Sequence, residues 1–188
     1  MDALGAARGW AWRGLGWGMV LSLVAAACGG GGSAADRPAS RESEGVAEGG
    51  GALPSVEVEM ADGTTVALAD VVEGRPLVVN FFASWCAPCR VEMPGFAAVH
   101  RDAADRVGFL GLAMQDTGDA AAEIVELTGV AYPWGLDPTG EIFAELGGFA
   151  MPTTVYVAAD GEIVGSDSGA IDEATLRARV ADLFGVPT

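Results

Sequence analysis

One short segment constrains the fold of this chain more than any other. Residues 77–82 form an apolar run, which predicts a strand buried on both faces of a sheet. Cys86 and Cys89 follow almost at once, and the residues after them favour a helix. Two thiols placed three residues apart across the first turn of a helix can close a disulfide. The first thiol then lies near the helix N-terminus, where unpaired backbone N–H groups and the helix dipole stabilise a thiolate.

The same two cysteines admit two other interpretations. A zinc site requires two further Cys or His ligands at short spacing, and the only candidates left, Cys28 and His100, have no such spacing. His100 is better explained as a surface or hydrogen-bonded helix residue. A small structural disulfide loop requires only the pair itself. The strand before the pair and the helix after it favour a redox dithiol. We therefore predict no metal site, and no cofactor other than the Cys86–Cys89 disulfide.

The charge of the chain excludes some classes of partner. Its 188 residues carry a formal net charge of −16, and every basic residue is Arg. Nucleic-acid binding requires a cationic surface, so a nucleic-acid partner is not expected. Electrostatic adhesion to anionic lipid headgroups is disfavoured for the same reason.

The N-terminal residues have the layout of a secretory signal peptide. Arg8 and Arg13 precede an uncharged, mostly apolar stretch over residues 14–24, and small residues lead to Cys28. This layout resembles a bacterial lipobox, in which the Cys is acylated and becomes the first residue of the mature protein. The odd third Cys supports lipidation of Cys28. Ordinary signal cleavage after Ala27 and an uncleaved anchor remain open, and all three alternatives place the domain outside the cytoplasm.

Composition divides the chain into three parts. Residues 1–27 are predicted to be the signal peptide. Residues 28–52 comprise the lipidated Cys and a flexible linker rich in Gly, Ser and Glu that contains no aromatic residue. Such a linker spans about 25–30 Å, enough to hold a small domain off a membrane. Residues 53–188 are predicted to form the folded domain, and the 51% hydrophobic content of the chain supports a core of its own.

The hydrophobic pattern of residues 53–188 alternates between strands and helices. Asp62-Gly63 and Asp160-Gly161 each lie between two short strands and indicate hairpins. The expected elements are strands at 56–60, 64–68 and 77–82, a helix at 86–105 kinked at Pro94, a strand at 107–114, helices at 119–128 and 139–146, strands at 153–158 and 162–166, and a helix at 172–184. This order predicts an α/β fold with a mixed central sheet, helices on both faces and an N-terminal β-hairpin.

Four local patterns occur together in this domain. They are Trp85-Cys86-Ala87-Pro88-Cys89, Met151-Pro152-Thr153-Thr154 ahead of a strand, Asn80 six residues before Cys86, and Glu92 three residues after Cys89. Together they resemble the thioredoxin-like superfamily, and within it the extracytoplasmic thiol-disulfide oxidoreductases of the ResA and TlpA type. The resemblance covers about residues 53–188 and implies a thioredoxin-like fold.

The resemblance implies catalytic roles for three side chains. Cys86 is the exposed nucleophile, with a pKa below that of a free Cys, and Cys89 resolves the mixed disulfide. Glu92 lies on the same side of the helix as Cys89. A partly buried carboxylate there would have a raised pKa and could take and return the proton of Cys89. The alternative for Glu92 is a solvated residue on the helix surface.

The resemblance also implies a substrate-binding surface beside the dithiol. Trp85, Ala87, Pro88 and Met151 are expected to form an apolar patch. Pro152 is expected to be cis and to face the dithiol, which leaves the Met151 backbone free to pair with a substrate strand.

The function implied by the resemblance is that of a membrane-tethered, extracytoplasmic thiol-disulfide oxidoreductase. It would reduce disulfides in exported proteins such as apocytochrome c and draw electrons from a transmembrane thiol carrier of the CcdA or DsbD type. One alternative is a non-catalytic lipoprotein that uses a thioredoxin fold for binding. Another is an oxidase that inserts disulfides, because the direction of exchange depends on a reduction potential that the sequence does not give.

Overall fold

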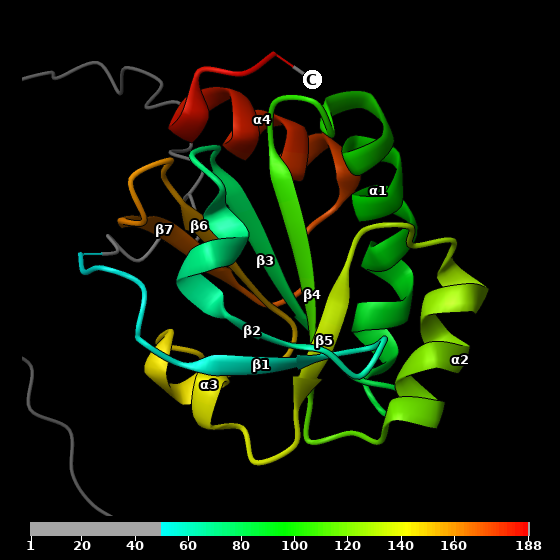
Figure 1. The fold of residues 1–188 in the computed structure, drawn as a ribbon. Coiled ribbons are helices and arrows are strands. Elements are labelled where there is room, and N and C mark those ends of the chain that lie inside the picture. The colour runs from blue at the N-terminus through cyan, green and yellow to red at the C-terminus, as the bar shows by residue number, and fades with distance from the viewer. Residues whose placement is uncertain (1–49, 188) are drawn as a thin grey trace, which may run out of the picture. The chain divides into compact units, whose positions relative to one another are not determined.

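A computed structural model describes residues 50–187 (Figure 1). The strands are β1 (Glu57–Met60), β2 (Thr65–Ala67), β3 (Leu77–Phe82), β4 (Gly108–Met114), β5 (Trp134–Asp137), β6 (Thr153–Val157) and β7 (Ile163–Ser168). The helices are α1 (Ala87–Ala103), α2 (Gly118–Thr128), α3 (Glu141–Glu145) and α4 (Glu173–Phe184), and a 3-10 helix, η1, spans Leu68–Val72. The predicted signal peptide, Cys28 and the linker up to residue 49 lie outside the described residues.

Within residues 50–187 the strands form one mixed sheet in the order β2-β1-β5-β4-β3-β6-β7. β3 pairs with β4 and β4 with β5 in parallel, and the other neighbours are antiparallel. The predicted α/β class and both predicted hairpins are therefore confirmed. The pairing begins slightly before residue 53, because Ala52 bridges Glu162 and the Gly51 carbonyl accepts a hydrogen bond from the Ile163 N–H at 2.8 Å.

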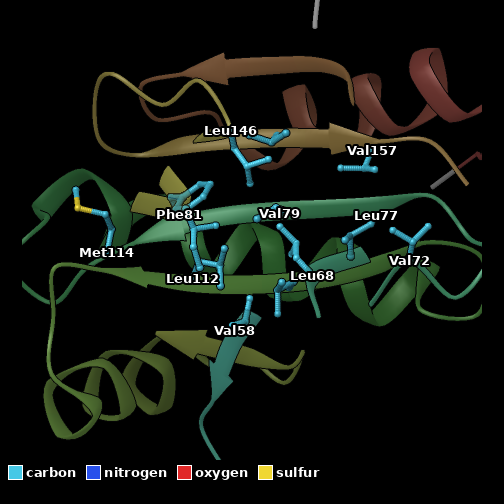
Figure 2. Packing of buried hydrophobic residues seen from close by; sticks show 13 residues of the cluster. Val58, Leu68, Val72, Leu77, Val79, Phe81, Leu112, Met114, Leu146 and Val157 are labelled. Carbon is cyan, nitrogen blue, oxygen red and sulfur yellow. The ribbon is translucent and has the colours of Figure 1, made fainter. Parts of the chain in front are cut away.

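Helices cover both faces of the sheet. On one face, α1 and α4 pack over side chains of β3 and β6 such as Val78 and Tyr156, and α2 packs beside α1. On the other face, η1 and α3 cover a cluster that includes Leu77, Val79 and Phe81 of β3 (Figure 2). All six residues of β3 are buried, as expected for a central strand with covered faces.

The sequence pattern did not predict β5. Its residues Trp-Gly-Leu-Asp follow Pro133 and contain no β-branched side chain, so the local signal for a strand is weak. Pairing with β4 and β1 places this segment in the sheet. A Cβ atom at Gly135 would lie 2.5 Å from Val58 Cγ1 and 2.7 Å from the Glu59 carbonyl oxygen. The close approach of β1 therefore requires glycine here.

The carboxyl ends of the parallel strands define one edge of the sheet. β3, β4 and β5 run in the same direction, so the turn after β3 and the N-terminus of α1 lie at this edge. Open α/β sheets place their functional groups at the carboxyl ends of parallel strands. The fold therefore presents the Cys-x-x-Cys segment where chemistry is expected. Between residues 50 and 187, no helix has both the length and the apolar character needed to cross a bilayer.

Candidate active site

The two cysteines lie where the sequence predicted, at the start of α1. Cys86 is the N-cap residue, and Cys89 lies in the first turn. The two sulfurs form a disulfide, and Cys86 Sγ accepts a hydrogen bond from the Cys89 N–H at 3.3 Å. Cys86 is 3% exposed and Cys89 is fully buried, so Cys86 is the more accessible residue of the pair, but in the disulfide form it is buried and not exposed as the resemblance implied. The N–H donor at Cys86 Sγ is suited to hold a thiolate after reduction.

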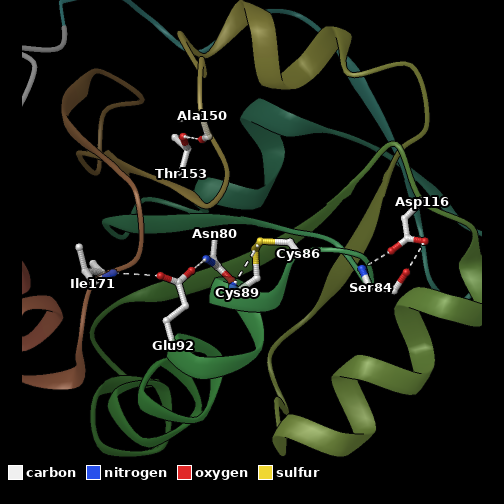
Figure 3. Close-up of a disulfide and its surroundings, with 9 residues drawn as sticks. All are labelled: Asn80, Ser84, Cys86, Cys89, Glu92, Asp116, Ala150, Thr153 and Ile171. Carbon is white, nitrogen blue, oxygen red and sulfur yellow. Dashed lines mark hydrogen bonds between the residues drawn. A yellow bond between two sulfur atoms is a disulfide. The ribbon is translucent and has the colours of Figure 1, made fainter. Parts of the chain in front are cut away.

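Glu92 is a buried carboxyl group one turn further along α1. It is 4% exposed, so the alternative of a solvated surface residue is wrong. Its Oε1 accepts a hydrogen bond from Asn80 Nδ2 at 3.0 Å, and its Oε2 accepts one from the Ile171 N–H at 3.1 Å (Figure 3). Burial raises the pKa of Glu92 to about 7, against the opposing effect of these two donors. The predicted rise in pKa is confirmed, and proton exchange with Cys89 stays a prediction.

Asn80 connects Glu92 to a second buried group. Its Oδ1 accepts a hydrogen bond from the Tyr132 hydroxyl at 3.4 Å, so the amide bridges the phenol and the carboxyl group. Asn80 comes from β3 and Tyr132 from the segment just before β5. The sequence pattern identified Asn80 but gave no signal for Tyr132, because the contact depends on how β5 pairs with the sheet.

The peptide bond between Met151 and Pro152 is cis, as predicted. Pro152 is buried, and Met151 packs against the cluster that contains Cys86 and Cys89. The Pro152 carbonyl accepts a hydrogen bond from the Gly169 N–H at 2.8 Å. The β7–α4 loop thus contacts both Pro152 and, through Ile171, Glu92.

Apolar side chains are exposed around the dithiol. Trp85, Ala87 and Pro88 are exposed, and Met151 is half-buried. The Trp85 indole N–H donates to the Gln115 carbonyl at 3.3 Å, which orients the ring. These residues are the four that the sequence predicted for an apolar patch.

Two further exposed apolar residues escaped the sequence analysis. Val91 lies one turn after Ala87 and Pro88 on α1, and Phe149 lies two residues before Met151. Helical spacing could have identified Val91. Phe149 could have been identified as an aromatic residue in the loop that leads to the predicted cis proline.

The turn that carries the cysteines is fixed to the next βα loop. The Ser84 N–H and hydroxyl both donate to the carboxylate of Asp116, at 2.5 and 2.9 Å (Figure 3). Asp116 also accepts from the Thr117 N–H at 2.9 Å. The carboxylate therefore joins the turn before α1 to the N-terminus of α2.

His100 lies away from the dithiol, in the last turn of α1. Its half-buried ring packs edge-on against Phe109 and Tyr132, and burial lowers its pKa. A pocket of about 400 Å³ is lined by His100, Arg75 and other residues at this end of the helix, opposite the cysteines. Among the described residues, no group of three His, Cys, Asp or Glu side chains could hold a metal ion.

Comparisons with known proteins agree with this geometry. The sequence profile of the Redoxin family matches residues 48–182. HelX of Rhodobacter capsulatus, a thiol:disulfide interchange protein, is 32% identical over 117 residues, which are 62% of this chain and 65% of HelX. ResA of Oceanobacillus iheyensis, a thiol-disulfide oxidoreductase, is 29% identical over 116 residues, which are 60% of this chain and 59% of ResA. The chain thus spans less than two thirds of the length of these relatives.

A solved structure supports the same relationship. The thiol:disulfide interchange protein of the thioredoxin family from Chlorobium tepidum superposes with a TM-score of 0.63 and 28% sequence identity. The match covers 72% of this chain and 97% of that one. The predicted thioredoxin-like fold is confirmed.

Proposed function

The chain belongs to the Redoxin family, and from this premise we propose that it is a thiol-disulfide oxidoreductase whose Cys86–Cys89 pair exchanges electrons with disulfides of other proteins. One observation carries the proposal. The disulfide lies at the N-terminus of α1, one turn from a buried carboxyl group whose pKa is raised to about 7. A purely structural disulfide has no need of such a neighbour.

The reaction starts from the reduced pair. The Cys86 thiolate attacks one sulfur of a substrate disulfide, and the other substrate sulfur leaves as a thiolate. Cys89 then loses its proton and attacks Cys86 Sγ in the mixed disulfide. The Cys86–Cys89 disulfide forms, and the second substrate sulfur leaves as a thiolate. Two electrons pass from the pair to the substrate, so each turnover requires a dithiol reductant that restores the pair.

Glu92 would act on the proton of Cys89. Cys89 is fully buried, so water has little access to its thiol. A carboxylate one helical turn away can accept that proton, and a pKa near neutral lets it return the proton when the pair is reduced again. In this scheme Cys86, Cys89 and Glu92 are the catalytic residues.

The exposed apolar side chains would bind the substrate. Trp85 and Pro88 adjoin the cysteines in the sequence, and Met151 packs against the cluster that contains them. Val91 on α1 and Phe149 near Met151 are further exposed apolar side chains. An extended substrate segment would pair with the Met151 backbone beside Pro152. Apolar residues next to the substrate cysteine fit this surface best.

Cysteine and glutamate variants test the activity. The reduced protein should reduce insulin disulfides, Cys86→Ser should abolish the reaction, and Cys89→Ser should accumulate a mixed disulfide through Cys86. Glu92→Gln should slow the reaction about 100- to 10,000-fold, the range typical of general acid–base groups. Glu123→Gln, which changes an exposed carboxyl group on α2, is the matched control and should leave the rate unchanged. A rate equal to wild type in Cys86→Ser would overturn the proposal.

Alkylation tests which thiol attacks. Limiting iodoacetamide should label Cys86 of the reduced protein first, because its thiolate is stabilised at the helix N-terminus. Mass analysis of the peptides locates the label. Preferential labelling of Cys89 would reverse the two roles.

We further propose that the protein works as a reductase on exported proteins, apocytochrome c among them, and receives electrons from a transmembrane thiol carrier of the CcdA or DsbD type. The signal-peptide layout and the similarity to HelX and ResA support this proposal. Equilibration with glutathione gives the reduction potential, and a strongly reducing value is expected. An oxidising value would favour disulfide insertion instead. A disulfide that dithiothreitol cannot open would favour a binding protein without redox activity.

Lipidation of Cys28 is proposed as the means of membrane attachment. Intact-mass analysis of membrane-extracted protein should find a mature chain that begins at Cys28 with added lipid. Cys28→Ser should block processing or release the protein, while the thiol chemistry of the domain persists. A soluble mature chain that carries an unmodified Cys28 at its N-terminus would overturn this proposal.

A further inference from the structure

The side-chain amide of Asn80 can face Glu92 in two ways. With Nδ2 toward Glu92 it donates a hydrogen bond and favours the carboxylate. With Oδ1 toward Glu92 it can only accept, which favours the protonated acid. In the structure Nδ2 donates to Glu92 Oε1 at 3.0 Å. Whatever fixes the amide therefore influences which form of Glu92 is stable.

The Tyr132 hydroxyl contacts the opposite end of this amide. It donates to Asn80 Oδ1 at 3.4 Å, and the amide is fully buried. Tyr132 is itself buried, and its ring packs against the rings of Phe109 and His100 with centroid distances of 5.6 and 5.5 Å. The phenol is thus held in place from two sides.

A glycine on the strand between them makes room for the phenol. Gly111 of β4 is paired with Asn80 in the β3–β4 register. A Cβ atom at Gly111 would lie 3.3 Å from Tyr132 Cε2 and 3.0 Å from Phe82 Cε1. The Gly111 N–H also donates to the Pro133 carbonyl at 2.9 Å, which fixes the backbone next to Tyr132. The bare surface of β4 at this point lets the ring reach across the strand to β3.

We propose that Tyr132 is a positioning residue whose hydroxyl holds the Asn80 amide with its donor end toward Glu92. The inference rests on the proposed function, in which the carboxylate of Glu92 accepts a proton from Cys89. Tyr132 touches neither the sulfurs nor the substrate in this scheme and acts only through Asn80.

The charge state of Tyr132 suits this task. Burial, and then the neighbouring charge of Glu92, raise the pKa of Tyr132 above its ordinary value, so the phenol stays a neutral donor. Tyr156 on β6 is the other phenol whose pKa is raised in part by the charge of Glu92, after burial and Asp167. Asp167 and Arg179 also lie on this side of the sheet, but they pair with each other.

The experiment is a titration of Glu92 in the disulfide form, in which neither cysteine titrates. Carbon-13 labelling of glutamate carboxyl groups makes the midpoint visible by NMR, and Glu92→Gln assigns the signal. Tyr132→Phe keeps the ring and removes the hydroxyl. The midpoint should rise by about half a pH unit to one pH unit, because the donor to the carboxylate is no longer fixed. Tyr156→Phe removes a buried hydroxyl that does not contact Asn80 and should leave the midpoint unchanged.

A second background tests whether the effect passes through Asn80. Asn80→Ala removes the amide, so Tyr132→Phe should then produce no further shift of the Glu92 midpoint. A wild-type midpoint in Tyr132→Phe, or an equal shift in the presence and absence of Asn80, would overturn the positioning role.

The titration also separates this inference from the proposed function. A shifted midpoint in a protein that reduces no disulfides would support the positioning role and overturn the function. An unshifted midpoint in a protein that reduces disulfides would overturn the positioning role and support the function. In the active protein, the pH dependence of disulfide reduction should move upward with the midpoint in Tyr132→Phe.

Discussion

Two buried carboxyl groups lie on the side of the sheet covered by α1 and α4, and their partners differ. Glu92 accepts hydrogen bonds from two neutral donors, the Asn80 amide and the Ile171 N–H. Asp167 accepts two hydrogen bonds from the Arg179 guanidinium, at 2.9 and 3.1 Å, and one from the Tyr156 hydroxyl at 2.9 Å. Each site thus combines a carboxyl group with a nearby phenol, but only the second contains a cation.

The difference shows what a cation does to a buried acid. Glu92 has no ion-pair partner among the described residues, so burial dominates and its pKa rises to about 7. At Asp167 the charge is matched, and the hydrogen bonds to Asp167 in turn raise the pKa of Arg179. The first arrangement suits proton exchange near neutral pH, and the second suits attachment of α4 to the sheet.

Removal of the cation should have the largest effect on stability. Arg179→Met leaves the buried Asp167 charge without its partner, and we expect a loss of about 2–4 kcal/mol at pH 7. The Arg179 side chain is 24% exposed, which keeps the loss below that of a fully buried pair. Urea denaturation measures the change. The double variant Asp167→Asn/Arg179→Met should recover part of the loss, and a loss below about 1 kcal/mol in the single variant would contradict the comparison.

The acid without a cation should make stability depend on pH in a defined direction. The pKa of Glu92 is about 7 in the folded chain against 4.5 for an ordinary Glu, so the folded chain binds the proton more tightly. The stabilising contribution is therefore complete below pH 4.5 and is lost as the pH rises through about 7. The full loss corresponds to about 3 kcal/mol.

The Glu92→Gln variant has no carboxyl group at this position, so its stability should not fall in this way as the pH rises. Urea denaturation between pH 4 and pH 8.5, a range chosen to bracket both values, should show the stability of the variant rising relative to wild type as the pH increases. Glu123→Gln, with its exposed carboxyl group, should follow the wild-type curve. Parallel curves for Glu92→Gln and wild type would show that Glu92 has the same pKa in the folded and unfolded chains, which would contradict the raised value.

Loss of the phenol at the paired site should have the smallest effect. Tyr156→Phe removes one hydrogen bond from Asp167, which keeps its guanidinium partner, so a loss of about 1 kcal/mol is expected. Disulfide reduction by the reduced protein should stay within about twofold of wild type. A change in the pH dependence of that rate would mean that the two carboxyl sites are coupled.

The parts of the fold that the sequence predicted are those with a local signal. The apolar run of β3, the hairpin turns and the helix after Cys86 all follow from neighbouring residues, and the structure places them within a few positions of the expected bounds. β5 has no such signal, because its strand conformation comes from pairing with β4 and β1.

The residues of the site also divide into those with a local sequence signal and those without one. Cys86, Cys89 and Glu92 lie within one helix start, and their spacing could be interpreted directly. Periodicity alone could not decide whether Glu92 is buried, because that depends on what packs over α1. Tyr132 lies 52 residues after its hydrogen-bond partner Asn80, and Ile171 lies 79 residues after its partner Glu92. No local sequence pattern indicates contacts over such separations.

The bond from the Ile171 N–H to Glu92 has a consequence for a growing or shortened chain. A fragment that ends before β6 already contains both cysteines, Asn80 and Glu92. It lacks the Ile171 donor and the segment around Pro152, which the Gly169 N–H holds in the complete fold. Such a fragment has both thiols but not the surroundings that set the acidity of Glu92. The number of thiols in a truncated form therefore does not measure its activity. The cysteines, Asn80 and Glu92 come from the middle of the sequence, but the backbone N–H groups that contact Glu92 and Pro152 come from its last forty residues.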